Sequence, residues 1–385
     1  MKKYSLLFVV LALMACVFSA SAQKLEGLEI HSDGPDMLKY GNPDIEIEAD
    51  DFLKTFELGD IVTVTVEGHD PIDVPVCSNY DDVFMGEKLL RTVSGKDNLC
   101  FAINYGQLGV ELGIVETAPE GSDFRYQVRE DVEFPISVTI EIKEKGGYTD
   151  RLALGLLTRT DEKEDYPELT DAEFANFREI TTTGIAPKTL YRSSNPVKDD
   201  IGRDEYADEA AKEAGIKTFV NLSDSEAVAK AYPNYEGSYY STQNVIYLAL
   251  PVTFTTDVFK EGFAEGFRFI ANNEGPYLFH CAEGKDRAGL MAAVLEALMG
   301  ASLEEIQDDY AKTYINYYDV KDGKQTEIEP AVLETIREII VRNLSASFEI
   351  EELAAVDLAE AAENYLLGIG LTADEITALK AAIGE

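Results

Sequence analysis

The sequence is poor in positive charge. Its 385 residues include 33 lysines and arginines against 72 aspartates and glutamates, which leaves a formal net charge of −39 at pH 7. Such a surface repels nucleic acid and anionic membranes, so neither is expected as a partner. Most of this charge serves solubility. An anionic substrate would therefore need a locally positive site, built from lysine or arginine side chains.

Histidine is also scarce, with three residues in the chain. His31 and His69 stand alone, without a plausible set of metal ligands, so we expect structural or surface roles for both. We expect no metal and no other cofactor. The chain contains no internal repeat and no low-complexity tract, and its hydrophobic content of 45% excludes a disordered chain.

Long hydrophobic runs are absent except at the N-terminus. Two lysines precede an apolar run from Leu6 to Phe18, and the small residues of 20–22 follow it. These three zones predict a secretory signal peptide over residues 1–22 and a mature chain that begins near Gln23. We therefore expect an extracytoplasmic protein, periplasmic or secreted, without a transmembrane span. As an alternative, residues 13–16 resemble a lipoprotein cleavage box, in which Cys16 would carry a lipid anchor.

Cysteine is rare, and only Cys77, Cys100 and Cys281 follow the predicted signal peptide. In an oxidising compartment Cys77 and Cys100 could form a disulfide, because both lie in the N-terminal region. Cys281 would then be an odd free thiol, which invites a chemical explanation. The alternative is that all three cysteines are buried and reduced, and act as small apolar residues.

The length and hydrophobic content suffice for two domains with their own cores. Residues 23–157 are β-rich, because 61–66 and 136–142 alternate apolar with polar residues or are rich in valine, isoleucine and threonine. These patterns predict a small β-sandwich or barrel-like domain of unknown role. The region contains no cluster of residues that could form an active site. Residues 158–170 are polar and acidic and predict a linker.

Residues 171–385 alternate between strand and helix patterns. Apolar stretches at 216–222, 245–250 and 276–280 predict buried strands, and the segments between them have helical spacing. Thr256 or its neighbour is expected to cap a helix whose aromatic stripe, residues 259, 263 and 267, belongs to the core. Capping boxes begin helices at Ser302 and Thr372, and Gly300 ends one. This alternation predicts an α/β domain with a mostly parallel central sheet flanked by helices.

The predicted strand 276–280 leads directly into a candidate active-site loop. Cys281 follows the strand, five residues separate it from Arg287, and an apolar run from Leu290 to Met299 predicts a helix. A thiolate is the nucleophilic form of cysteine, and it is stabilised by the positive end of a helix, by inward backbone N–H groups and by Lys285 and Arg287. The same groups would hold a phosphate, whose oxygens match the arginine fork.

The motif His280-Cys281-x-x-Gly284-Lys285-Asp286-Arg287-x-Gly289 resembles the signature loop of the cysteine-dependent tyrosine phosphatase family, which includes tyrosine, dual-specificity and phosphoinositide phosphatases. Four further stretches, in chain order, are similar to family motifs: 176–178, 190–193, 309–310, and 365–366 with 370–372. The resemblance covers residues from about 168 to 385 and none of the β-rich region. A bare Cys-x5-Arg pattern is less specific, since sulfur-transfer domains share it.

The resemblance implies roles for individual residues. Cys281 would be the nucleophile, Arg287 the phosphate clamp and Asp286 the general acid that then activates water. The residues expected to bind substrate or to line its pocket are His280, Ala282, Glu283, Gly284, Lys285 and Arg192. In this family the loop lysine favours substrates with extra negative charge, and the histidine assists ionisation of the cysteine.

Several of these roles have structural alternatives. Asp286 could be a first-turn helix acid, Lys285 a solvated loop charge, and Arg192 a member of a structural ion pair. Asp257 is the alternative general acid, although helix capping would also explain it.

Two positions depart from the family pattern. Ala288 stands where a serine or threonine usually follows the loop arginine, and its missing hydroxyl is expected to slow hydrolysis of the intermediate. Asn221 and Ser223 replace an aspartate and an arginine that are often found on the strand before the loop. We expect an enzyme that hydrolyses phosphate monoesters through a cysteinyl-phosphate, most simply on protein phosphotyrosine. The alternatives are a phosphoinositide or inositol-phosphate phosphatase, and a phosphate-ester-binding module with little turnover.

Overall fold

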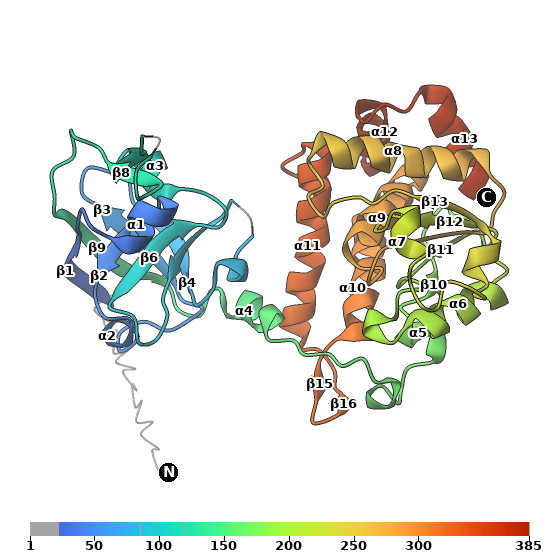
Figure 1. Ribbon diagram of the computed structural model, residues 1–385, viewed down its shortest axis with the longest axis horizontal. Helices are drawn as coiled ribbons and strands as arrows, with labels where there is room; N and C mark the ends of the chain where they lie inside the picture. Colours follow the sequence, from blue (N-terminus) through green and yellow to red (C-terminus); the bar gives the residue numbers. More distant parts are fainter. Residues whose placement is uncertain (1–22, 85, 120, 385) are drawn as a thin grey trace, which may run out of the picture. The chain divides into compact units, whose positions relative to one another are not determined.

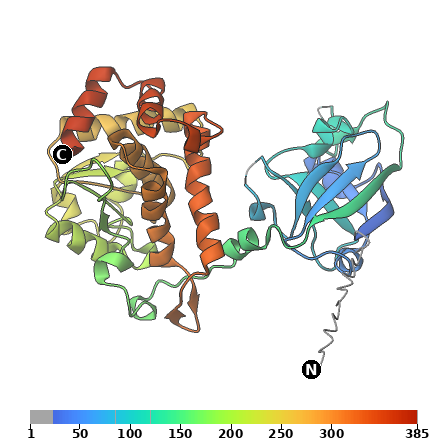
Figure 2. The same cartoon turned by 180° about the vertical axis from the view of Figure 1, so that it is seen from behind.

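The computed structural model describes residues 23–84, 86–119 and 121–384, and the predicted signal peptide and Cys16 lie outside them. The chain forms two compact units, the first ending at Leu152 and the second beginning at Ala153 (Figures 1 and 2). Among the described residues, no helix is both long and apolar enough to cross a bilayer.

The first unit is built on one seven-stranded sheet, with the strand order β1-β9-β3-β4-β5-β6-β2. All neighbours are antiparallel except β4 and β5. The end strands β1 and β2 also lie side by side, so the sheet is nearly closed, and the barrel-like prediction is confirmed. The strands are β1 (Lys24–Ile30), β2 (Asp44–Glu46), β3 (Ile61–Val66), β4 (Ile72–Cys77), β5 (Lys88–Arg91), β6 (Asn98–Ile103) and β9 (Ile136–Glu144).

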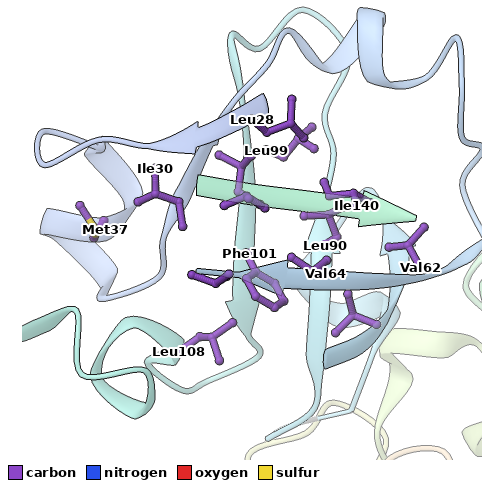
Figure 3. Close-up of a cluster of buried hydrophobic side chains, with 14 of the residues drawn as sticks. Leu28, Ile30, Met37, Val62, Val64, Leu90, Leu99, Phe101, Leu108 and Ile140 are labelled. Carbon is purple, nitrogen blue, oxygen red and sulfur yellow. The ribbon is translucent and has the colours of Figure 1, made fainter. Parts of the chain in front are cut away.

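Strict alternation builds the core of this unit. In β3 the three valines are buried and the intervening residues are half-buried, as a period of two requires. Figure 3 shows Val62 and Val64 meeting Leu90, Phe101 and Ile140 from other strands. Connections between the strands carry α1 (Pro35–Tyr40), α2 (Ala49–Phe52), α3 (Leu108–Glu111), a 3-10 turn at Tyr80–Asp82, and the hairpin of β7 (Val115–Thr117) and β8 (Tyr126–Val128).

The structure does not form the possible disulfide between Cys77 and Cys100, and the alternative of buried, reduced cysteines holds for both. Both cysteines are buried free thiols in one small apolar cluster of the first unit. In the sheet, Cys77 and Cys100 are each paired with Arg91, from opposite sides of β5. Two strand spacings, roughly 9–10 Å, therefore separate their backbones. A disulfide requires Cα atoms within about 7 Å, so the intervening strand excludes it.

Residues 158–170, predicted as a linker, lie in the second unit, after the short helix α4 (Thr149–Gly155). The hydroxyl of Tyr166 donates to the carbonyl oxygen of Tyr317 at 2.8 Å, and its ring is fully buried beside Phe174. Thr158 bonds Val320 through both backbone and side chain. Aromatic packing and hydrogen bonds thus hold this segment against the rest of the second unit.

The second unit has a five-stranded sheet in the order β10-β11-β14-β12-β13. Only the edge strand β10 is antiparallel, so the prediction of a mostly parallel sheet in an α/β unit is confirmed. The three predicted strands appear as β12, β13 and β14, each somewhat shorter. The bounds are β10 (Arg178–Glu179), β11 (Leu190–Ser193), β12 (Thr218–Asn221), β13 (Asn244–Tyr247) and β14 (Tyr277–His280).

Helices surround this sheet, as the two opposite views show (Figures 1 and 2). Thr256 caps α8 as predicted, and its aromatic stripe is buried. The helix after the loop, α9, is buried on nearly all sides between the sheet and its neighbours α10, α11 and α12. The bounds are α5 (Asp171–Phe174), α6 (Asp204–Glu213), α7 (Glu226–Ala229), α8 (Asp257–Asn272), α9 (Asp286–Met299), α10 (Leu303–Tyr317), α11 (Pro330–Phe348), α12 (Leu358–Gly368) and α13 (Ala373–Ile383), with a hairpin of β15 (Val320–Lys321) and β16 (Lys324–Gln325).

The predicted helix ends are also confirmed. Ser302 and Thr372 form capping boxes at the start of α10 and α13, and Gly300 ends α9 in the left-handed conformation at φ 95°. Of these signals, Gly300 sets the end of α9. The first turn of α9 follows the loop that leaves the carboxyl end of the central strand β14.

Candidate functional site

The loop of residues 281–285 lies between β14 and α9. Parallel neighbours β11 and β12 flank β14, so their carboxyl ends meet at the same edge of the sheet. Open α/β sheets bind their ligands at this edge. Cys281 leaves β14 directly and is 3% exposed, and α9 begins at Asp286. The thiol thus faces the positive N-terminal end of a fourteen-residue helix.

The loop has its carbonyl oxygens turned outward. Backbone N–H of Asn195 donates to the carbonyl of residue 282 at 3.1 Å, and Asn176 Nδ2 and the Tyr317 hydroxyl donate to that of residue 283 at 3.0 and 2.9 Å. Arg192 Nη2 donates to those of residues 284 and 285 at 2.7 and 3.1 Å.

The backbone N–H groups of the loop are left without partners. Within the described residues, none of the N–H groups of 282–286 donates to a protein acceptor. Unpaired N–H groups in a curled loop at a helix N-terminus form a binding site for an anion. The loop therefore has the geometry of a phosphate cradle around the Cys281 thiol.

Gly284 is required by the close packing of the loop. Its φ of +69° lies in the left-handed region, and a Cβ atom there would come within 2.1 Å of the Ser193 carbonyl oxygen. Only glycine meets both conditions without strain. The glycine thus lets the loop lie directly against the end of β11.

Arg287 is held in place and still has a free donor. Its Nη1 donates to the carbonyl oxygen of Leu250 at 2.8 Å, which fixes the orientation of the guanidinium. Its Nε is buried and has no hydrogen-bond partner among the described residues. An oriented guanidinium with an unused donor, on the first turn of α9, fits the predicted phosphate clamp.

Arg192 does not line the pocket, and this part of the prediction is corrected. The side chain is fully buried, with Nη2 on the loop carbonyls and Nη1 on Asp309 Oδ2 at 2.7 Å. The structural ion pair, the other interpretation from the sequence, is what the structure shows. Arg192 carries no free charge toward a ligand; instead it turns the loop carbonyls away from the cradle.

The carboxylate of Asp309 supports this arrangement. Asp309 also binds Arg178, whose Nε lies 2.8 Å from Oδ1. Burial alone would raise the pKa of Asp309, but the two arginines hold it well below its usual range. Removing Asp309 would leave two buried guanidinium groups unpaired beneath the loop.

Glu296 lies on α9 near this cluster and is 1% exposed, and its Oε1 has no hydrogen-bond partner among the described residues. Burial raises the pKa of Glu296 well above its usual range, and the charge of Asp309 adds to the effect. The folded protein therefore keeps a proton on Glu296 at a pH where the unfolded chain has released it.

We predict that Glu296→Gln stabilises the protein at alkaline pH. Folding of the wild type takes up a proton, so its stability falls as pH rises above the unfolded pKa of about 4.3, by about 1.4 kcal/mol per pH unit until the folded pKa is reached. Glutamine does not titrate, so the free energy of unfolding of Glu296→Gln should not show this fall, and the variant should become more stable relative to wild type as pH rises. Urea unfolding of both proteins at pH 6 and pH 8 measures this difference in the free energy of unfolding. Glu338→Gln, the same change at an exposed position of α11, should show no such trend.

His280 is fully buried at the end of β14. Burial lowers the pKa of His280 to about 4, so the ring is neutral at pH 7. Its Nδ1 lies 3.3 Å from the Cys281 carbonyl oxygen, and its Nε2 lies 3.3 Å from the Tyr240 hydroxyl. The prediction that His280 contacts substrate is corrected, because the ring contacts the backbone of Cys281 and the Tyr240 hydroxyl instead.

The departure at Asn221 is explained by a buried polar network. Asn221 Nδ2 donates to the Tyr240 hydroxyl at 3.1 Å, and Tyr240 in turn meets His280. The carboxylate of this network is Asp224, which accepts from Asn195, from Ser223 and from Tyr232 at 2.7, 3.0 and 3.1 Å. The sequence contained no local signal for Asp224 or Tyr240.

Lys285 is enclosed by acids and tyrosines beside the loop. Its Nζ lies 3.0 Å from Glu283 Oε2, 3.1 Å from the Tyr318 hydroxyl and 4.0 Å from Asp286 Oδ2. Burial alone would lower the pKa of Lys285, but these neighbours hold it above its usual range. Glu283 also pairs with Arg159 at 2.8 Å. The side chain of Glu283 therefore holds two cations rather than substrate.

The two candidate general acids differ in position. Asp286 is the first residue of α9, directly at the loop, and its side chain is 47% exposed. Asp257 is the exposed first residue of α8, after the capping Thr256. Ala282 lies in the loop itself, and Ala288 is fully buried in the first turn of α9. Of the two acids, only Asp286 adjoins the cradle in the chain.

His31 is not as isolated as the sequence suggested. Its Nε2 lies 3.2 Å from Glu29 and 2.8 Å from Glu46, where β1 meets β2. The ligand atoms of these three side chains lie within 4.8 Å of one another, and all three are substantially exposed. The sequence could not show this group, because Glu46 comes from a different strand.

Comparison with known proteins agrees with this geometry. The family model described as the tyrosine phosphatase family matches residues 171–385, more than half of the chain. A Cupriavidus necator protein named "Putative tyrosine-protein phosphatase" is 28% identical over 127 residues, which cover 29% of this chain and 46% of that protein. The chain thus spans less than half of that relative's length.

Two solved structures are also similar. The core catalytic domain of a PP-IP phosphatase from S. cerevisiae, in complex with citrate, has 17% identity and a TM-score of 0.28, over 44% of this chain and 92% of that one. An uncharacterized conserved protein from Thermotoga maritima has 23% identity and a TM-score of 0.20, over 30% of this chain and 35% of that one. With the family model spanning the whole second unit from α5 onward, the chain belongs to the tyrosine phosphatase family.

Proposed function

We propose that this protein hydrolyses phosphate monoesters, and that protein phosphotyrosine is its substrate. The observation that carries the proposal is the loop itself, in which unpaired N–H groups and the free Nε of Arg287 accompany the thiol of Cys281. These groups would hold three phosphate oxygens and stabilise the charge that develops on them during transfer.

The reaction has two steps. The sulfur of Cys281 attacks phosphorus, the bond from phosphorus to the leaving oxygen breaks, and Asp286 donates its proton to that oxygen. The carboxylate of Asp286 then removes a proton from water as the water oxygen attacks phosphorus. The phosphorus–sulfur bond breaks, and the enzyme returns to its first state with phosphate released.

Phosphotyrosine is favoured over a polyphosphorylated inositol by the environment of Lys285. An inositol with several phosphates would need a free cation beside the cradle, but Glu283 and Asp286 already neutralise this lysine. Glu283 is in turn bound to Arg159. A second phosphate group of the substrate would have to displace Glu283 from Lys285 and Arg159, and two ion pairs would be lost.

A panel of phosphotyrosine peptides, phosphoserine peptides, phosphoinositides and soluble inositol phosphates tests this choice. We expect the highest kcat/KM for phosphotyrosine peptides, by about tenfold or more over every inositol phosphate. A clear preference for inositol phosphates would contradict it. Export from the cytoplasm, proposed from residues 1–22, is tested separately by N-terminal sequencing of the protein from its host, with Gln23 expected as the first residue.

We predict that Asp286→Asn lowers kcat/KM for a phosphotyrosine peptide by about 100-fold, the usual contribution of a general acid. For an aryl phosphate with a good leaving group, which needs little protonation, the loss should be smaller. Asp257→Asn is the matched control and should stay within threefold of wild type on both substrates. If Asp257→Asn lowered kcat/KM more than Asp286→Asn did, the general acid would be Asp257 on α8.

A module that binds phosphate esters with little turnover remains the second candidate, because of Ala288. This residue is fully buried and offers no hydroxyl to the sulfur when phosphate leaves. Stopped-flow kinetics with an aryl phosphate separate the two candidates. A stoichiometric burst followed by almost no steady-state release would favour the binding module, and steady turnover would exclude it.

A further inference from the structure

A second binding site lies in the β-rich unit. The structure contains a cavity of about 940 Å³, within the size range of small-molecule sites. Helix α1, the 3-10 turn at Tyr80–Asp82, the strands β5 and β6 and the loop of residues 104–107 surround it. The sequence contained no recognisable site in this region, because the lining residues come from four separate stretches, 35–42, 80–81, 91–107 and residue 125.

The floor of the cavity is the outer face of the sheet. Leu90, Leu99 and Phe101 point into the barrel core. Side chains alternate along a strand, so Arg91 and Cys100 project to the opposite face, where they line the cavity. Cys100 packs in a small apolar cluster on this face, whereas Arg91 belongs to neither apolar cluster of the unit.

Arg91 lines the cavity with a donor that has no partner among the described residues. Its guanidinium lies over the ring of Tyr80, 5.1 Å from the ring centre, and its Nε is buried without a hydrogen-bond partner in the described part of the chain. A buried donor without a partner costs about 1–3 kcal/mol. A ligand that accepts this hydrogen bond would recover that free energy.

The charge in the cavity is opposite to that of the chain. Arg91, Lys96 and Arg125 line it, and within the described residues no carboxylate lies within 4.0 Å of any of them. Other cations of the same unit, such as Lys88 and Lys143, are paired with acids. In a chain with 72 acidic and 33 basic residues, three unpaired cations at one cavity indicate a site for an anionic ligand.

The cavity also offers flat apolar faces and acceptors. Tyr40 and Tyr105 line it and are 46% and 79% exposed, so most of the Tyr105 ring lies in water. Such a ring can cover the C–H face of a sugar, while its hydroxyl bonds with polar groups. The carboxylates of Asp36 and Asp81 can accept hydrogen bonds from hydroxyl groups, and they would repel a uniformly charged polyanion.

From these groups together we propose that the cavity of the first unit binds an acidic oligosaccharide. Its carboxylate or sulfate would pair with Arg91, Lys96 and Arg125, and its ring faces would cover Tyr40 and Tyr105. Its hydroxyl groups would donate to Asp36 and Asp81. The site does not depend on the chemistry of the second unit.

Isothermal titration calorimetry with the full chain tests this site. The probes are oligogalacturonate, alginate and heparin oligosaccharides, with neutral galacto-oligosaccharides of the same length and a phosphotyrosine peptide for comparison. We expect at least one acidic oligosaccharide to bind with a Kd below about 1 mM. The neutral sugars should bind at least about tenfold more weakly, since they lack the charge-assisted hydrogen bonds. Saturating inorganic phosphate should not compete.

Three substitutions locate the site. Arg91→Gln and Tyr105→Ala should each weaken acidic oligosaccharide binding by about tenfold or more, and Lys96→Gln, at an exposed position, serves if Arg91→Gln does not fold. Lys143→Gln, which removes a charge paired with Asp73 elsewhere in the unit, should leave Kd within twofold. Failure of every acidic oligosaccharide to bind, equal losses in Lys143→Gln, or binding of the phosphopeptide alone would overturn the proposal.

Discussion

Replacing Cys281 with serine should reduce turnover of an aryl phosphate by at least about 10⁴-fold, because a serine hydroxyl lacks the reactivity of a thiolate in this loop. Binding of phosphate or tungstate should persist. In the proposed mechanism the N–H groups of residues 282–286 and the free Nε of Arg287 would hold the anion, and the substitution removes none of them. Steady-state kinetics and calorimetry on the same preparation measure both quantities.

The matched control for this experiment is Cys77→Ser, which alters a buried thiol in the first unit. It should leave turnover unchanged, although a hydroxyl in an apolar cluster lowers stability. Undiminished turnover in Cys281→Ser would exclude the cysteinyl-phosphate mechanism. Loss of tungstate binding together with turnover would show that the thiol supports the loop rather than the reaction.

Arg287→Lys should lower kcat/KM by about 10³-fold while keeping the positive charge. Lysine offers a point charge on a flexible stem, whereas the guanidinium donates two parallel hydrogen bonds in one plane. The contact from Arg287 Nη1 to the Leu250 carbonyl oxygen orients that plane, and a lysine cannot both make this contact and reach the anion. The loss should appear in kcat more than in KM, since charge develops on the phosphate oxygens during transfer.

Arg268→Lys is the control for the chemical change. Arg268 lies on α8, where its side chain pairs with Glu265 and Glu375. Because these are partly exposed ion pairs, the substitution should keep kcat/KM within twofold of wild type. If Arg287→Lys were as active as wild type, the two hydrogen bonds of the guanidinium would not be required for catalysis, and the prediction would be wrong.

The elements around the loop could be predicted because their signals are local. The capping threonine before α8, the capping boxes of α10 and α13, and the glycine after α9 each act within a few residues of their own position. In the sequence, a strand is followed by Cys281, five residues, Arg287 and a helix. This order alone places the predicted nucleophile and the predicted phosphate clamp at the two ends of one loop.

The partners of the loop could not be predicted, because packing brings them from far along the chain. Arg192 reaches the carbonyl of Gly284 across 92 positions, and Asn176 reaches that of Glu283 across 107. The motif around Arg192 indicated a functional residue, but only the structure showed that its guanidinium lies beneath the loop. The interposed strand β5 likewise decided that Cys77 and Cys100 stay apart.

By itself, the sequence determined the parts of the phosphatase loop, the α/β character of residues 171–385 and the strands of the first unit, since these follow from periodicity and short-range capping. Only the tertiary structure decided which side chains face the phosphate cradle, which groups neutralise Lys285, and where unpaired cations converge on a cavity in the first unit. The physical reason is that burial and ion pairing depend on distances between segments, which the order of residues does not contain.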